Sequence, residues 1–198
     1  MMLNLHGTLP RSLVNGPGER TVVHLQGCSL HCPGCFNQWS WPTRPHEMVD
    51  PERLADQLLQ SNNRVTISGG EPMDQPGPVC ALVRALRMMD PDCSILMFTG
   101  YTVEQLDRMV WWEPIREQLD IAVSGPYRKE LQVRGAPLIG SSNQQILMLS
   151  GRHTWKEILM EGGPGPTVEA HVAPDGTITI TGFPPDRAIE ELRSQEDE

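Results

Sequence analysis

Short apolar runs that end at glycine or proline alternate along the chain with segments of helical spacing, and this alternation constrains the fold most strongly. Strands are expected at residues 21–26, 64–68, 94–98, 119–123 and 145–149. A helix is expected after the N-cap pair Asp50-Pro51, another over Val79–Leu86, and a third after Thr102. Strands that alternate with helices indicate βαβ units and a parallel sheet. The sequence therefore predicts an α/β fold.

The last part of the chain differs in composition from the rest. Residues 162–166 form a Gly/Pro linker, and β-prone residues follow on both sides of the turn sequence Pro174-Asp175-Gly176. This pattern is typical of a β-hairpin. The charged residues from Asp186 onwards are expected to form a helix or a frayed tail. We therefore divide the chain into a core, residues 1–161, and a C-terminal hairpin with a charged tail, residues 162–198.

Charge and hydropathy argue against two classes of partner. The formal net charge of -9 argues against nucleic acid, because a phosphate-binding face needs clustered Lys and Arg. No apolar run approaches the length of a membrane span, and the N-terminus lacks the basic start and apolar stretch of a signal peptide. We therefore expect a cytoplasmic protein with neither a membrane nor a nucleic-acid partner.

Three of the five cysteines lie in one short loop, Cys28, Cys32 and Cys35, with the spacing C-x3-C-x2-C. In a reducing compartment such a group indicates a metal site and not a disulfide framework. Soft thiolates suit iron–sulfur clusters and zinc. A four-iron cluster has four corners, so three ligands would leave one iron open to a small chelating ligand. The loop therefore predicts a reactive [4Fe-4S] cluster.

Structural zinc is the alternative interpretation of this loop. Zinc wants four ligands, and the fourth would have to be His24, His31 or His46. We instead expect His31 to be a loop residue that shields the cluster. Cys80 and Cys93 lie on apolar segments, where a lone cysteine usually serves packing.

Several motifs resemble one known family. The spacing of Cys28, Cys32 and Cys35 resembles the radical-SAM superfamily signature, and the string Cys32–Trp41 resembles the activating enzymes of anaerobic ribonucleoside-triphosphate reductase. Three further segments fit that family over roughly residues 3–149: Ile67–Met73, Phe98–Tyr101, and Gly140–Gln144 after Asp120–Pro126. Two features depart from it, because Ser124 stands where an acidic residue is frequent and the chain continues well past Leu149.

The resemblance implies a partial open (β/α) barrel of radical-SAM type with a small C-terminal β-hairpin extension. It also implies that S-adenosylmethionine (SAM) binds the open iron. Glycine has no side chain to clash, so Gly69 and Gly70 would let the backbone approach SAM, and Glu71 would accept hydrogen bonds from its ammonium group. The remaining candidates for cofactor contacts are Thr99 at a strand end, Gly34 and Phe36 beside the adenine, and Asn143, which also fits a turn cap.

The function implied by the resemblance is cleavage of SAM to a 5′-deoxyadenosyl radical, which takes a hydrogen atom from a glycine of a partner reductase. An electron donor such as flavodoxin or ferredoxin would reduce the cluster. The segment Trp39–Trp41 would lie at the partner interface, since aromatic residues suit interfaces. Two alternatives stay open: radical-SAM modification of a peptide or small molecule, with the hairpin as a recognition element, and a non-catalytic iron–sulfur or zinc module.

Overall fold

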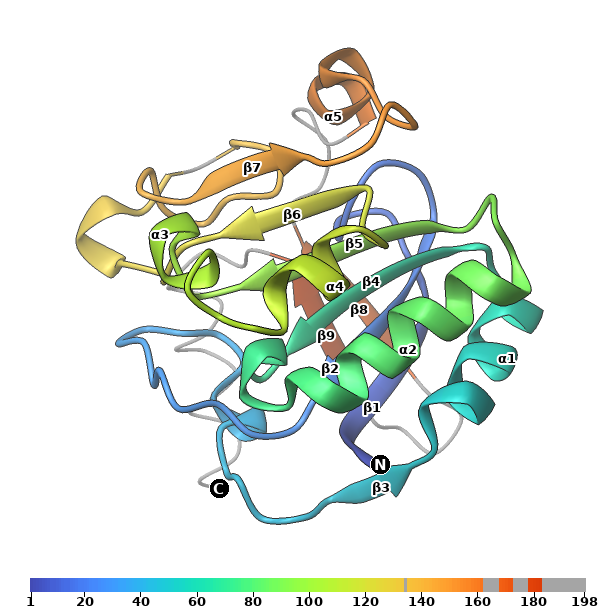
Figure 1. Ribbon diagram of the computed structural model, residues 1–198. Helices are drawn as coiled ribbons and strands as arrows, with labels where there is room; N and C mark the ends of the chain where they lie inside the picture. Colours follow the sequence, from blue (N-terminus) through green and yellow to red (C-terminus); the bar gives the residue numbers. More distant parts are fainter. Residues whose placement is uncertain (134, 162–167, 173–177, 183–198) are drawn as a thin grey trace.

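The computed structural model describes residues 1–133, 135–161, 168–172 and 178–182, which form a seven-stranded sheet and a separate two-stranded sheet (Figure 1). The strands are β1 Leu3–Ser12, β2 Arg20–Leu25, β3 Glu47–Val49, β4 Arg64–Gly69, β5 Ser94–Thr99, β6 Ile121–Ser124, β7 Gln145–Met148, β8 Val168–Val172 and β9 Ile178–Gly182. The α-helices are α1 Pro51–Ser61, α2 Pro76–Met89, α3 Val103–Leu106, α4 Trp112–Arg116 and α5 Trp155–Glu161. Short 3₁₀ turns are η1 Gln38–Ser40, η2 Pro72–Asp74 and η3 Lys129–Leu131.

The centre of the large sheet is parallel. Its strand order is β3-β1-β2-β4-β5-β6-β7, in which β2, β4, β5 and β6 pair in parallel, while β1, β3 and β7 pair antiparallel. Helices connect β4 to β5 and β5 to β6, as βαβ units require. Strands β8 and β9 pair antiparallel. The predicted α/β class and the C-terminal hairpin are therefore confirmed.

Helices α1, α2 and α4 cover one face of the sheet (Figure 1). The side chain of Asp50 caps α1 by accepting hydrogen bonds from the N–H groups of Glu52 and Arg53, and Thr102 forms the predicted capping box with Gln105. The main core lies between this helical layer and the sheet. Its buried members include Leu54, Leu58, Leu82, Val83 and Leu86 from the helices and Val23, Leu25, Val65, Ile67, Ile95 and Met97 from the strands.

The opposite face of the sheet carries a second, smaller core. Leu96, Ile121 and Val123 of the sheet pack there with Leu138 and with Ile158 of α5. The β8–β9 hairpin also lies on the side of the sheet away from α1 and α2 (Figure 1). Two hydrogen bonds attach it to the β1–β2 connection: Asn15 Nδ2 donates to Thr181 Oγ1 over 2.8 Å, and the N–H of Leu13 donates to Glu169 over 2.8 Å.

The first strand, β1, was not anticipated from the sequence. It contains few β-branched residues, includes Pro10, and its register with β2 shifts twice, between Leu5 and Gly7 and between Leu9 and Ser12. A broken alternation of this kind gives little period-two signal. The predicted linker 162–166, the turn at 174–176 and the tail from Asp186 lie outside the described residues. No helix among the described residues is long and apolar enough to cross a membrane.

Candidate metal and cofactor site

The cysteine loop lies at the carboxyl ends of the parallel strands, on the left of Figure 1. The registers bring Leu25 beside Gly69 and Thr99 beside Ser124, so the connections that follow β2, β4, β5 and β6 meet at this edge. Open α/β sheets bind ligands at the carboxyl ends of their strands. The segments identified in the sequence are therefore brought to one place by the topology.

Backbone hydrogen bonds fold the cysteine loop back on itself. The N–H of Gly27 donates to Ser40 O over 2.7 Å and the N–H of Cys28 donates to Trp41 O over 3.1 Å, so the beginning and end of the loop are held together. Within it, Cys35 N–H donates to Cys32 O over 3.0 Å. All three cysteine side chains are partly exposed, as ligands of an accessible cofactor must be.

The surroundings of the three thiols combine partial burial with hydrogen-bond donors. Burial raises the pKa of Cys28, against the effect of backbone hydrogen bonds from His31 and Leu30. Burial likewise raises the pKa of Cys32 and Cys35, and backbone or side-chain donors again act in the opposite direction. Such donors stabilise a thiolate and tune an iron–sulfur centre. In the part of the chain that the structure describes, no three His, Cys, Asp or Glu side chains are grouped to hold a metal ion.

Gly69 and Gly70 are required by the packing of the chain on itself. Gly69 has a φ of +92°, where an L side chain is strained, and a Cβ there would strike the backbone of β2. A Cβ on Gly70 would strike the carbonyl oxygen of Gly27, directly before Cys28. The N–H of Glu71 donates to that same Gly27 oxygen over 2.8 Å. The turn after β4 therefore supports the start of the cysteine loop.

The carboxylate of Glu71 is 2% exposed and binds the chain's own donors. Oε1 accepts from the Met73 N–H over 2.9 Å and from Thr99 Oγ1 over 2.7 Å, and Oε2 accepts from the Gly100 N–H over 2.8 Å. Burial raises its pKa to about 7, although these bonds oppose the shift. A carboxylate has about four acceptor positions, so one on Oε2 remains available.

Thr99 and Ser124 join the strand ends around this carboxylate. Thr99 is buried and donates to Glu71, and Ser124 Oγ donates to Tyr101 O over 2.8 Å. A carboxylate at position 124 would be unable to donate this bond. The departure from the family pattern at Ser124 therefore has a structural role in this chain, linking β6 to the loop after β5.

Asn143 lies beside the end of β6 and has one unsatisfied polar atom. Its Nδ2 donates to Pro126 O over 2.7 Å, while its buried Oδ1 has no hydrogen-bond partner. Buried acceptors are normally paired, so this oxygen is suited to a ligand. Phe36 packs edge-to-face on Trp39, with ring centroids 5.1 Å apart, and a Cβ on Gly34 would lie 3.2 Å from Lys129 Cδ.

One residue near the site was not singled out from the sequence, and another was named there only as a possible zinc ligand. Asp74 follows the Glu71 turn and binds Ser29, the residue after Cys28. His24 is on β2, its Nδ1 is buried without a partner, and burial lowers its pKa to about 4. The available signal for Asp74 was an acidic residue three positions after Glu71, and such a signal is not specific.

The other cysteines and histidines lie elsewhere or have other contacts. Cys80 and Cys93 are buried in the main core, which agrees with their predicted packing role. The ring of His31 meets that of Trp41 with centroids 4.9 Å apart. His46 Nδ1 is 3.2 Å from Leu5 O, and the His46 ring contacts that of His6.

The chemistry of the donor set at this edge suits an iron–sulfur cluster. The donor set is three thiolates from one loop, and each thiolate of such a cluster binds a different iron. The free acceptor position on Glu71 and the unpaired Oδ1 of Asn143 are suited to the polar groups of a bound cofactor.

Comparison with known proteins gives the family. The 4Fe-4S single cluster domain family matches residues 14–147. The anaerobic ribonucleoside-triphosphate reductase-activating protein of Vibrio cholerae is 32% identical over 73% of this chain and 97% of its own length. Its counterpart in Escherichia coli K12 is 27% identical over the same shares, and that of phage T4 is 29% identical over 73% and 93%.

Among solved structures, that of QueE from Escherichia coli matches 52% of this chain and 54% of its own, at 18% identity and a TM-score of 0.43. The family match includes Cys28, Cys32 and Cys35 and gives a 4Fe-4S cluster as the cofactor of this domain. The chain therefore belongs to the 4Fe-4S single cluster domain family and, within it, with the anaerobic ribonucleoside-triphosphate reductase-activating proteins.

Proposed function

We propose that this chain cleaves SAM reductively at a [4Fe-4S] cluster bound by Cys28, Cys32 and Cys35, and that it places a radical on a glycine of an anaerobic ribonucleotide reductase. The observation that carries the proposal is the meeting of the cysteine loop with the Gly69–Glu71 turn, through the hydrogen bond from Glu71 N–H to Gly27 O. The names and the extent of the matched relatives support the choice of partner.

The residues around the cluster would bind and orient SAM. The free position on Glu71 Oε2 would accept a hydrogen bond from the amino group of SAM, and the unpaired Asn143 Oδ1 would accept one from a hydroxyl or amino group. Gly34 and Phe36 border the third cysteine and would contact the adenine, while Thr99 holds Glu71 in place.

When bound, the cluster and SAM supply a one-electron cleavage that gives methionine and a 5′-deoxyadenosyl radical. The protein's part is to hold the reactants and to exclude water. A flavodoxin or a ferredoxin would supply the electron. Trp39, which is 49% exposed beside the loop, would contact the reductase, because exposed aromatic side chains suit interfaces.

The finer architecture belongs to the same proposal. The parallel strands β2, β4, β5 and β6 would form a partial open (β/α) barrel of radical-SAM type, with residues 1–161 as the core and 162–198 as an extension. We also expect the protein to act in the cytoplasm, where thiols stay reduced.

The C-terminal extension favours a second candidate function. The Vibrio cholerae relative matches over 97% of its own length but 73% of this chain, so about a quarter of this chain has no counterpart in it. The hairpin in this extension is attached to the β1–β2 connection by Asn15 and Leu13. Such an added element would suit recognition of a peptide or a small molecule.

The test is to mix the reconstituted enzyme, SAM, a strong reductant and the reductase encoded by the same genome without oxygen. We expect a glycyl-radical doublet in the electron paramagnetic resonance spectrum, which disappears when the partner glycine is changed to alanine. Deoxyadenosine formation without a radical on any such reductase would favour the second candidate.

A further inference from the structure

Asp74 connects three segments of the site. Its Oδ2 accepts from the Ser29 N–H over 2.6 Å, and its Oδ1 accepts from Ser29 Oγ over 2.9 Å and from the Tyr101 hydroxyl over 3.2 Å. Ser29 directly follows Cys28, Asp74 ends η2, and Tyr101 follows β5. These bonds join the cysteine loop to the connections after β4 and β5.

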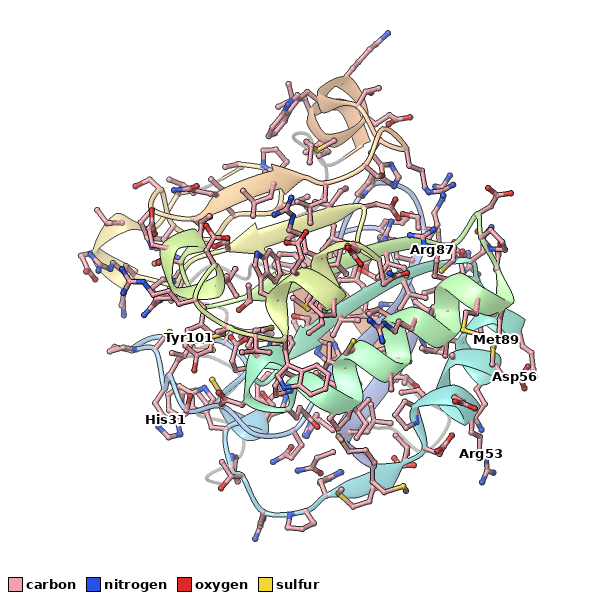
Figure 2. The ribbon with its side chains drawn as sticks, in the orientation of Figure 1. His31, Arg53, Asp56, Arg87, Met89 and Tyr101 are labelled. Atoms are coloured by element: carbon pink, nitrogen blue, oxygen red, sulfur yellow. The ribbon has the colours of Figure 1, made fainter. Side chains whose placement is uncertain are left out.

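The two bonds from Ser29 are of the strong type, since the acceptor is a carboxylate. They hold the residue next to Cys28 by both its backbone and its side chain. Figure 2 shows His31 of the cysteine loop and Tyr101 on the same side of the molecule, while Arg53 and Asp56 of α1 lie on the opposite side. Asp56 is an aspartate far from the cysteine loop, so it provides a control for substitutions of Asp74.

The carboxylate also acts on the first cysteine through its charge. Its Oδ2 lies 2.6 Å from the backbone nitrogen of Ser29, the residue directly after Cys28, so the negative charge is held beside the first cysteine of the loop. A negative charge beside an iron–sulfur cluster disfavours the addition of an electron to it, and net charge is one of the main determinants of iron–sulfur potentials. Solvent weakens this effect because Asp74 is exposed, but the direct bonds to Ser29 keep the charge beside the loop.

We propose that Asp74 is a positioning residue for the cluster: it fixes the cysteine loop through Ser29, and its negative charge lowers the reduction potential of the iron–sulfur centre. A lower potential makes the reduced centre a stronger electron donor to SAM. This inference rests on the proposed cluster at Cys28, and it adds a residue that no motif of the sequence indicated.

The positioning role is tested on the protein without iron, by the rate at which iodoacetamide alkylates Cys28, followed by peptide mass spectrometry. Asp74→Ala removes the acceptor of both Ser29 bonds, so we expect alkylation to be at least about fivefold faster, the change that one lost hydrogen bond allows. Ser29→Ala keeps the backbone bond and should give a smaller increase. Asp56→Asn should alkylate at the wild-type rate, and an Asp74→Ala rate equal to the wild type would overturn the positioning role.

The charge role is tested by the midpoint potential of the reconstituted cluster without SAM. Asp74→Asn keeps the size of the side chain and loses the charge, so its potential should rise above the wild-type value, while Ser29→Ala and Asp56→Asn should show no rise. An unchanged potential in Asp74→Asn would overturn the charge role. Asp74→Asn could fail to hold iron, and the alkylation of Cys28 in that variant then decides. Faster alkylation than in the wild type would support the positioning role, and an unchanged rate would overturn it.

The two measurements separate this inference from the proposed function. A wild-type chain that binds no iron would contradict the proposed cluster, whereas alkylation of Cys28 would still decide whether Asp74 fixes the loop. Neither measurement involves the reductase.

Discussion

At the amino ends of the parallel strands, every polar atom of two buried charged side chains is paired, whereas at the carboxyl ends several buried atoms are left open. Arg20 is fully buried, and its five N–H donors bind Thr66 Oγ1, Val65 O, Ser94 O, Ser94 Oγ and Pro17 O. Burial lowers its pKa to about 9. The bonds reach β4 and β5, so this guanidinium ties three neighbouring strands together.

Asp120 is the second buried charged residue at the amino ends of the parallel strands. Its two carboxylate oxygens accept from the Ile95 N–H, Arg87, Ser150 and Arg152 at 2.6–3.2 Å. Burial opposes ionisation, but these donors together hold its pKa below the ordinary value. All four acceptor positions are therefore occupied.

At the carboxyl ends of the parallel strands, in contrast, some buried polar atoms have no hydrogen-bond partner or keep a free acceptor position. Glu71 keeps one acceptor position, and His24 Nδ1 and Asn143 Oδ1 are buried without partners. Among the described residues, the other buried side-chain atoms without a hydrogen-bond partner are Glu169 Oε2 and His171 Nε2 of the hairpin, which lie 3.6 Å from each other. The difference indicates that one end of the sheet serves stability while the other is left incomplete for a ligand.

The largest expected effect is loss of the cluster at the carboxyl end. Cys28→Ala, Cys32→Ala or Cys35→Ala removes a thiolate, so the iron content after anaerobic reconstitution should fall sharply in each variant. Cys80→Ala, in the main core, should keep the wild-type iron content. Full iron binding by any of the three loop variants would remove that cysteine from the ligand set.

A large stability effect is expected at the amino end. Arg20→Met removes all the hydrogen bonds of the buried guanidinium, including those to Val65 O and Ser94 O, so the free energy of unfolding should fall by about 3 kcal/mol. Urea denaturation of the protein without iron measures it. Arg11→Met, at an exposed ion pair with Glu19, is the control and should cause no measurable change. Equal effects of the two variants would contradict the assignment of this end to stability.

An intermediate effect is expected in the pH dependence of stability. The raised pKa of Glu71 means that the folded chain holds this proton up to about pH 7, whereas the unfolded chain releases it near 4.5. The contribution of Glu71 to stability is therefore present at low pH and lost as the pH rises from 4.5 to 7. Burial lowers the pKa of His24, whose contribution has the opposite sign and is lost as the pH falls from 6.5 to about 4.

The two contributions are separated by comparing variants. Subtracting the unfolding free energy of Glu71→Gln from that of the wild type, at each pH, should give a difference that falls between pH 4.5 and 7. The same subtraction for His24→Gln should give a difference that falls as the pH decreases. A flat difference for Glu71→Gln would mean that this carboxyl group is not buried as described.

The smallest effect is expected at Asn143. Asn143→Ala removes one hydrogen bond, to Pro126, from the free protein, and under the proposed function it would remove a second one from the complex with SAM. The stability loss should be about 1 kcal/mol, and SAM should bind roughly fivefold more weakly. Calorimetric titration of the reconstituted variant measures the affinity. A loss of stability with wild-type SAM affinity would limit Asn143 to a turn-capping role.

The sequence predicted the parts of the fold that depend on local pattern. The glycine-terminated runs marked β2, β4, β5 and β6 to within about two residues, and the cap at Asp50 was identified correctly. β1 was missed because its alternation is interrupted, and the pairing of β1 between β2 and β3 depends on contacts distant in sequence.

The candidate site was predicted where a motif is compact. The cysteines, the Gly-Gly turn and Glu71 stand in short recognisable strings, and the topology brings them to one edge. Asp74 and Arg20 carry no such signal, since their roles depend on partners distant in the chain, such as Ser29 for Asp74 and Val65 for Arg20, each 45 positions away. Packing gives Gly70 a second role that the sequence did not indicate, since its missing side chain makes room for the carbonyl of Gly27.

The most direct test of the account is to measure 5′-deoxyadenosine formed from SAM by the reconstituted chain with a strong reductant and no oxygen. The account predicts product that depends on the reductant, on four irons per chain, and on each of Cys28, Cys32 and Cys35. A chain that holds four irons and binds SAM but forms no 5′-deoxyadenosine, or one that still forms it after any of these cysteines is changed to alanine, would contradict the account.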